Sequence, residues 1–273
     1  MDGDLFELED LVPLLAAPVG LSSYDYTFRS HFRCRSLLRA PDAPVIARVG
    51  AIDDYAARYA ALLADGIRLI HDPAEHDRCS LASGWAPLLA ELTPETWVCD
   101  RLPPVDQVEA HFGWPVFLKG DRQTSRHRGE LSIARSREDY ARIDQAWEGD
   151  HILRWQRAAV RRFVPLRRVG DRPEGIPASY EFRAFCWRGQ VLSAAPYWTS
   201  HAYQATHGEQ EAIHVLAAEA ARRVDVPFLV VDVAQAATGA WIVIEVNDAQ
   251  EASYAGNVPL VVWNRLLDLE RSR

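Results

Sequence analysis

Apolar and polar residues recur with two different periods along the first part of the chain, and together they predict a small α/β unit. Residues 45–49 (VIARV) form a short apolar run that predicts a strand. Residues 53–65 carry apolar side chains three and four positions apart, which predicts an amphipathic helix. The run IRLI at 67–70 predicts a second strand, and Asp72-Pro73 predicts a turn after it.

In the remaining chain, short apolar runs alternate with amphipathic stretches and predict a mixed α+β architecture. Turn residues at Arg188-Gly189 and Thr238-Gly239 predict two antiparallel hairpins. We expect helices at 85–92, 105–112, 137–147 and 209–223, and strands at 116–119, 131–134, 160–164, 180–187, 190–195, 228–233 and 241–246.

The pair Pro103-Pro104 is the strongest linker signal in the sequence. It predicts a smaller N-terminal α/β domain over 1–103 and a larger domain over 104–273. The second domain contains both predicted hairpins, so we expect it to be built on antiparallel sheets with helices.

Two carboxylates face each other in the second predicted hairpin. With the two-residue turn named above, Asp232 lies opposite Glu245, and Asn247 shares the face of Glu245 because side chains alternate along a strand. Their neighbours are mostly valine and isoleucine, so the carboxylates need a cation, a proton or a basic partner. Carboxylate and amide oxygens suit Mg²⁺, with phosphates completing its coordination. The alternatives are two solvent-facing acids on an edge hairpin, or an acidic pair bridged by arginine.

Composition singles out one basic residue. The chain has 30 lysines and arginines in total, and Lys119 is its only lysine. An ammonium is a compact point charge and a guanidinium is a wide planar fork, so this lysine indicates a place where arginine does not serve. The loop that follows (GDRQTSRHRGE, 120–130) carries Thr124 and Ser125 between two glycines, a composition suited to wrapping phosphates. The alternative is a solvated turn.

A further polar pair lies on the strand predicted at 180–187. Glu181 and Arg183 are two residues apart and therefore share one face. Such a face is either exposed to water or lines a site. In a site, the Arg183 guanidinium would suit the oxygens of a phosphoryl group in transfer.

Net charge and cysteine usage exclude several classes of protein. The formal net charge of −8 disfavours general binding to nucleic acid or to an anionic membrane. The apolar runs are too short for a membrane span, and the acidic start of the chain is unlike a secretory signal. Four dispersed cysteines without a CxxC pair indicate reduced thiols, so we expect a cytoplasmic protein.

The order of these features resembles the ATP-grasp superfamily over residues 97–257. The matching residues are the strand lysine with its glycine-bracketed loop, the strand AVRRFVPL, the EFRAF strand, and Asp232 followed by Glu245-x-Asn247. The segment ARVGAIDDYAARYAALLADGIRLIHDP resembles the ATP-grasp clade named for two arginines and one lysine. This resemblance implies an ATP-grasp fold preceded by a smaller α/β pre-grasp domain.

The resemblance also implies roles for individual residues toward ATP and Mg²⁺. Lys119 would contact the phosphates, the 124–129 loop with Thr124 and Ser125 would cover them, and Arg183 would steady the transferring phosphoryl group. The metal ligands would be Asp232, Glu245 and Asn247. The remaining residues implied at the nucleotide are Arg162, Phe163 and Val164 at the adenine, and Glu181 and Arg48.

This sequence departs from the superfamily pattern at two places. The superfamily has a second phosphate-contacting lysine, for which Arg101 or an arginine in 154–162 would have to substitute. The pair Arg161-Arg162 lies where an acidic residue is usual.

The resemblance implies an ATP- and Mg²⁺-dependent ligase that joins a carboxylate to an amine through an acylphosphate. Its substrates would be small molecules or peptides. The alternatives are an ATP-grasp phosphotransferase without ligation and a non-catalytic nucleotide-binding module.

Overall fold

Two four-stranded antiparallel sheets dominate the structure. The structure, a computed structural model, describes residues 14–15, 44–48, 54–122, 129–151, 153–171 and 175–273. In spatial order, the first sheet consists of β3 (Thr96–Cys99), β6 (Ala158–Arg162), β4 (Val116–Gly120) and β5 (Ile133–Ala134). The second consists of β10 (Gln190–Pro196), β9 (Glu181–Trp187), β11 (Phe228–Gln235) and β12 (Trp241–Asp248).

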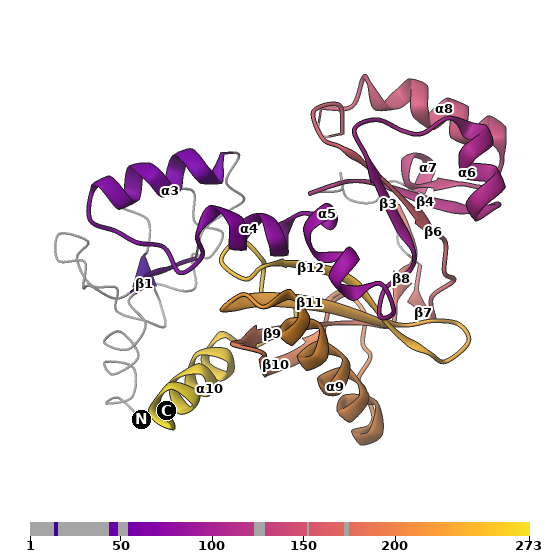
Figure 1. The fold of residues 1–273 in the computed structure, drawn as a ribbon. Helices are drawn as coiled ribbons and strands as arrows, with labels where there is room; N and C mark the ends of the chain where they lie inside the picture. Colours follow the sequence, from indigo (N-terminus) through magenta and orange to yellow (C-terminus); the bar gives the residue numbers. More distant parts are fainter. Residues whose placement is uncertain (1–13, 16–43, 49–53, 123–128, 152, 172–174) are drawn as a thin grey trace.

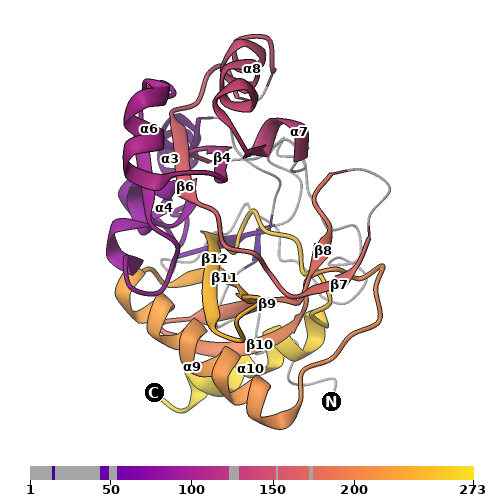
Figure 2. The same cartoon turned by 90° about the vertical axis from the view of Figure 1, so that its right-hand side faces the viewer.

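Helices cover one face of the first sheet. They are α6 (Val105–Phe112), α7 (Gly129–Ser132) and α8 (Arg137–Trp147), as Figure 2 shows. Val116, Leu118 and Val160 form one buried cluster with Val108 of α6 and Ile143 of α8. Because side chains alternate along a strand, the intervening residues of β4 and β6 point to the opposite face of the sheet.

The second sheet packs helices on both faces, and strand alternation divides its side chains between them. Ala184 and Val231 belong to a buried cluster with α9 (His207–Val224). Phe185 and Val230 belong to another cluster, with α10 (Pro259–Arg271). In Figure 1 the first sheet with α6–α8 lies at the upper right, and the second sheet with α9 and α10 lies below it.

The N-terminal part supplies shorter elements. Helices α3 (Tyr55–Ala64), α4 (Pro73–Ser80) and α5 (Ala82–Trp85) precede a 3₁₀ turn, η2 (Pro87–Leu89). A two-stranded parallel sheet pairs β1 (Leu14–Leu15) with β2 (Ile46–Ala47). A second two-stranded sheet, farther along the chain between β6 and β9, pairs β7 (Arg168–Gly170) with β8 (Ala178–Ser179). No helix in the described part of the chain has the length and apolar character needed to cross a membrane.

The turn predicted at Asp72-Pro73 is wrong, because these residues begin helix α4. Pro73 occupies the first turn, where its missing N–H costs nothing. The Asp72 side chain accepts from the Glu75 N–H (2.8 Å), and the Glu75 side chain accepts from the Asp72 N–H (2.9 Å). The two side chains form a capping box, which the sequence pattern D-x-x-E could have predicted.

Other predicted elements differ from the structure in extent. The helix predicted at 85–92 is divided, with α5 ending at Trp85 and η2 beginning at Pro87, because proline cannot continue the hydrogen-bond ladder. The strand predicted at 131–134 is half helical, since Ser132 ends α7. The strand predicted at 67–70 is a single bridge between Leu69 and Val45.

Strand β6 ends at Arg162, two residues earlier than predicted. The predicted helices 105–112 and 137–147 coincide with α6 and α8. Helix α10 was not predicted.

The β11–β12 hairpin preserves the predicted opposition of Asp232 and Glu245 by a different route. The Ala236 N–H donates to the Ala240 carbonyl (2.8 Å), so three residues lie in the turn, and the predicted two-residue turn is wrong. A β-bulge then adds Ile244 as an extra residue in β12. The two differences cancel, and Asp232 pairs with Glu245.

The division of the chain at residues 103–104 stays a prediction. Strand β3, which precedes that position, pairs with β6, and the Tyr140 hydroxyl donates to the Pro103 carbonyl (2.7 Å).

Replacing Trp263 tests the contribution of α10. Its side chain is fully buried beneath the second sheet, and its indole N–H donates to the Tyr254 hydroxyl (2.8 Å). Trp263→Ala should lower the free energy of unfolding by about 3–5 kcal/mol in urea denaturation. Val261→Ala, at a half-exposed position of the same helix, should change it by less than about 0.5 kcal/mol. Equal effects of the two substitutions would contradict this packing.

Candidate functional site

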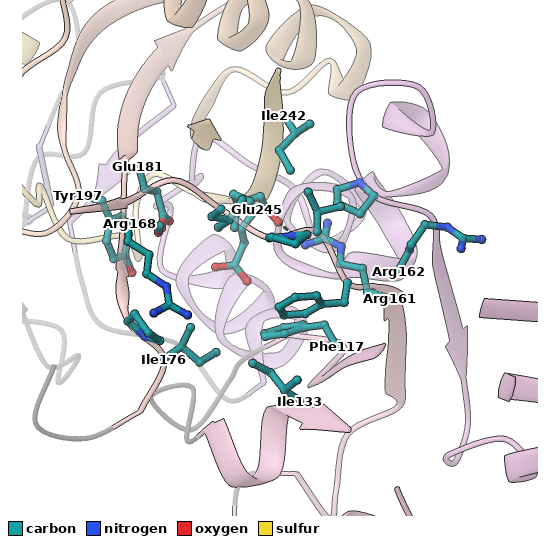
Figure 3. Close-up of a pocket in the computed structure, with 18 of the residues that line it drawn as sticks. Phe117, Ile133, Arg161, Arg162, Arg168, Ile176, Glu181, Tyr197, Ile242 and Glu245 are labelled. Atoms are coloured by element: carbon teal, nitrogen blue, oxygen red, sulfur yellow. Dashed lines mark hydrogen bonds between the residues drawn. The ribbon is translucent and has the colours of Figure 1, made fainter. Parts of the chain in front are cut away.

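A cavity of about 330 Å³ is lined by residues from both large sheets. Phe117 and Ile133 of the first sheet, with Ile242 and Ile244 of β12, give it apolar walls (Figure 3). The segment from β6 to β7 closes another side with residues 163–166. An apolar slot beside irregular backbone suits a flat aromatic ring, which would find hydrogen-bond partners at that backbone.

Glu245 and Glu181 also line this cavity, and a buried ion pair lies next to them. The Arg183 Nε and Nη2 atoms donate to the two carboxylate oxygens of Asp232 at 2.8 and 2.7 Å. This bidentate pair follows from the sheet, because Arg183 of β9 and Asp232 of β11 are register partners. Burial lowers the pKa of Arg183, but the Asp232 charge outweighs this and raises it overall, so the guanidinium stays charged.

A second ion pair joins the two sheets. The Lys119 ammonium, at the end of β4, contacts the Glu245 carboxylate of β12. The lysine is nearly buried, and Glu245 keeps part of its side chain exposed. The structure therefore brings the chain's single lysine to the acidic hairpin, although 126 positions separate the two residues.

The predicted metal ligands lie on one hairpin, but basic partners already engage both carboxylates. Asp232 has the arginine partner that the sequence left as an alternative. A carboxylate oxygen accepts more than one bond, so Asp232 and Glu245 keep the capacity to bind a cation. Asn247 lies two residues beyond Glu245 and is partly exposed. This set of hard oxygen donors fits Mg²⁺ by its chemistry.

Glu181 is buried beside these charges. Its carboxylate accepts from the Ser179 hydroxyl at 2.7 Å. Burial, with a further contribution from the Asp232 charge, raises the pKa of Glu181 to about 8. The Glu181 side chain is therefore mostly protonated at neutral pH, and it can donate a hydrogen bond into the cavity.

The two adjacent arginines of β6 point in different directions. Arg161 is buried and lies between the sheets, whereas Arg162 is exposed, points away from the cavity centre (Figure 3) and pairs with Glu95 at 2.6 Å. The predicted hinge residues Phe163 and Val164 line the cavity with Arg162. Arg161 is thus the inward-facing member of the pair, although the resemblance implied a role at the nucleotide for Arg162.

Arg48 lies outside the residues that line this cavity. Its guanidinium donates to the Ala249 carbonyl and to the Ala252 carbonyl, the latter at 2.9 Å. It also stacks over the Tyr254 ring, 4.4 Å from the centroid. Arg48 therefore fixes the segment that follows the acidic strand. Thr124 and Ser125 lie outside the described residues.

Sequence reasoning missed a buried network next to Asn247. His71 Nδ1 lies 2.9 Å from an Asp248 oxygen, and the Phe228 N–H donates to His71 Nε2 (3.1 Å). The Phe228 bond assigns the proton to Nδ1, so the imidazole donates to the carboxylate. Cys79 completes the group close enough to hold a metal, but its thiol contacts the His76 carbonyl, and this network is satisfied as a structural one. Only the strand position of Asp248 could have indicated it.

Comparison with known proteins identifies the family to which this chain belongs. The model for family 3 of the ATP-grasp domains in the clade named for two arginines and one lysine matches residues 111–266. No curated protein matches the chain. Among solved structures, a RimK domain ATP-grasp protein from Sphaerobacter thermophilus is similar, with a TM-score of 0.58, 16% identity, and 95% of this chain and 99% of that chain covered.

Two further solved structures are similar at low identity. D-alanine–D-alanine ligase from Bacillus anthracis, complexed with ATP, has a TM-score of 0.57 and 13% identity, covering 82% of this chain and 75% of that one. The ATP-grasp ligase PsnB, complexed with minimal precursor, Mg and ADP, has a TM-score of 0.50 and 15% identity, covering 80% and 67%. The predicted ATP-grasp fold and the resemblance to the clade are thereby confirmed.

The raised pKa of Glu181 predicts how stability depends on pH. Because burial favours the protonated carboxyl, its contribution to stability is complete below pH about 4.5 and is lost as pH rises to about 8. Glu181→Gln keeps the acceptor for Ser179 but does not titrate. The stability of this variant relative to wild type should therefore increase from pH 5 to pH 8, by up to about 1.4 kcal/mol per pH unit. Urea denaturation of both proteins measures the difference, and a difference independent of pH would contradict it.

Proposed function

The chain belongs to family 3 of the ATP-grasp clade named for two arginines and one lysine, and from this premise we propose that it is an ATP- and Mg²⁺-dependent ligase that joins a carboxylate to an amine. One observation carries the proposal. The Lys119–Glu245 and Arg183–Asp232 pairs meet beside an apolar cavity between two sheets. An apolar slot suits the aromatic base of a nucleotide, and charged side chains that can change partners suit its triphosphate.

The cavity and the charges have separate roles in the proposed site. Phe117, Ile242 and Ile244 enclose the base, and the backbone at 163–164 offers it hydrogen bonds. When the nucleotide binds, the Lys119 ammonium releases the Glu245 carboxylate and contacts phosphate oxygens instead. Asp232, Glu245 and Asn247 would hold Mg²⁺, which when bound neutralises phosphate charge.

Transfer of the γ-phosphoryl group of ATP to a carboxylate gives an acylphosphate and releases ADP. An amine then attacks the acyl carbon, which forms the amide and releases phosphate and a proton. This chemistry requires positioning and charge neutralisation and no nucleophilic side chain. In this proposal the Arg183 guanidinium, which lies beside the acidic hairpin, stabilises the transferring group. Two structural neighbours, D-alanine–D-alanine ligase and PsnB, are named as ligases, which supports ligation over phosphoryl transfer alone.

Calorimetric titration with ATP at saturating Mg²⁺ tests the nucleotide site. Lys119→Ala and Glu245→Ala should each weaken ATP binding about tenfold or more, because each removes a charge that acts on phosphate or metal. Arg142→Ala and Glu211→Ala, at exposed positions, are the matched controls and should bind as wild type does. A folded wild-type protein that binds no ATP would refute the proposal.

Phosphate release tests ligation. With ATP, Mg²⁺ and a library of amino acids, peptides and other carboxylates, release should require both a carboxylate and an amine, and mass spectrometry should detect the amide. Arg183→Lys should lower the rate of phosphate release about 100-fold or more. An ammonium cannot reproduce the bidentate contact that the guanidinium makes with Asp232, nor the paired contacts of a guanidinium with phosphoryl oxygens. If a phosphorylated product accumulates when no amine is present, the protein is instead a phosphotransferase that does not ligate.

A further inference from the structure

The bulge in β12 leaves a carbonyl that the neighbouring strand does not pair. In an antiparallel ladder the extra residue of a bulge has no opposite partner, and here that residue is Ile244. A backbone carbonyl in the protein interior requires a donor. The bulge immediately precedes Glu245, so the donor that satisfies Ile244 also fixes the peptide from which the Glu245 side chain departs.

Arg161 supplies that donor from the other sheet. Its Nη1 atom donates to the Ile244 carbonyl at 2.6 Å. Its Nη2 atom donates to the Thr93 hydroxyl (2.6 Å), and its Nε atom donates to the Thr96 hydroxyl (3.1 Å). The Thr93 hydroxyl in turn donates to the Val243 carbonyl at 2.9 Å, on the other side of the bulge. One guanidinium thus connects β6 with the 93–96 segment and with β12, to the Ile244 carbonyl directly and to the Val243 carbonyl through the Thr93 hydroxyl.

The environment of Arg161 shows that this connection is unusual. The side chain is buried, yet among the described residues its hydrogen-bond acceptors are all uncharged. Burial lowers the pKa of Arg161 to about 10, and nearby Glu245 partly opposes this, so the group stays cationic at neutral pH. The ring of Trp85, 5.4 Å from the guanidinium carbon, adds a favourable face. Burying a cation among neutral acceptors is costly, which argues that its geometry has a use beyond stability.

We propose that Arg161 is a positioning residue that holds the bulge of β12, and through it Glu245, in the geometry needed to bind a divalent cation. The proposal rests on the proposed function for its metal. It requires the planar fork of arginine, because three acceptors on two segments lie around one guanidinium, and an ammonium could not reach all of them. Groups that orient a metal ligand in this way typically change metal affinity by about 10- to 100-fold when they are removed.

Magnesium dependence separates this role from a direct phosphate contact. ATP binding is measured by calorimetry across a series of Mg²⁺ concentrations for wild type, Arg161→Gln, Arg161→Lys and Arg142→Gln. Both Arg161 variants should need about tenfold more Mg²⁺ or higher for half-maximal binding, with little change in ATP affinity at saturating Mg²⁺. Arg142→Gln, at an exposed position of α8 away from the cavity, should match wild type. Equal weakening at every Mg²⁺ concentration, or wild-type behaviour of Arg161→Lys, would overturn the proposal.

Hydrogen exchange tests the same inference without ligand or activity. In the ligand-free protein, peptides covering Trp241–Asp248 should exchange about tenfold faster in both Arg161 variants than in wild type or Arg142→Gln. Peptides covering β9 should stay unchanged, because general destabilisation would accelerate both strands. Unchanged exchange in β12 would overturn the proposal. If wild type binds no ATP, the proposed function fails, and the exchange result still decides whether Arg161 holds the bulge.

Discussion

The opposition of two carboxylates in a mostly buried strand pair is the constraint on which the rest of this site depends. Asp232 and Glu245 are register partners in apolar surroundings, where uncompensated like charges are unfavourable. Their compensation comes from two directions. Arg183 lies on the adjacent strand of the same sheet, and Lys119 reaches across from the other sheet. The charges that make the hairpin possible therefore also draw the two sheets together around the cavity.

Local rules predicted much of this arrangement. Strand alternation put Glu181 and Arg183 on one face, and composition singled out Lys119. The opposition of Asp232 and Glu245 was predicted correctly from a wrong turn, because the bulge at Ile244 offsets the longer turn. At this bulge the Ile244 carbonyl accepts from Arg161 on a distant segment, and that contact leaves no local pattern in the sequence.

Contacts between distant segments account for what the sequence did not show. Arg161 and Arg162 are equivalent by composition, and only the pairing of β6 with its neighbours decides which one faces inward. The N-terminal part contributes in the same way. Arg48 binds the carbonyls after β12, and the backbone N–H of Ala47 donates to Gln250 (3.0 Å). Segments far away in the chain thus contact β12 at Ile244, just before Glu245, and also contact the residues that follow the strand.

The bulge also separates β12 into two halves with different chemistry. On the turn side, Ile242 and Ile244 face the cavity and Val243 faces the core; beyond it, Glu245 faces the cavity and Val246 the core. Because of the extra residue, the consecutive side chains of Ile244 and Glu245 both face the cavity. An apolar wall and an acidic site therefore occupy consecutive stretches of one strand. Changes in size at Ile242 would then alter which ring fits without moving the carboxylates. In the proposed site, selectivity for the base and affinity for the cation would therefore depend on different residues of one strand and could be redesigned separately.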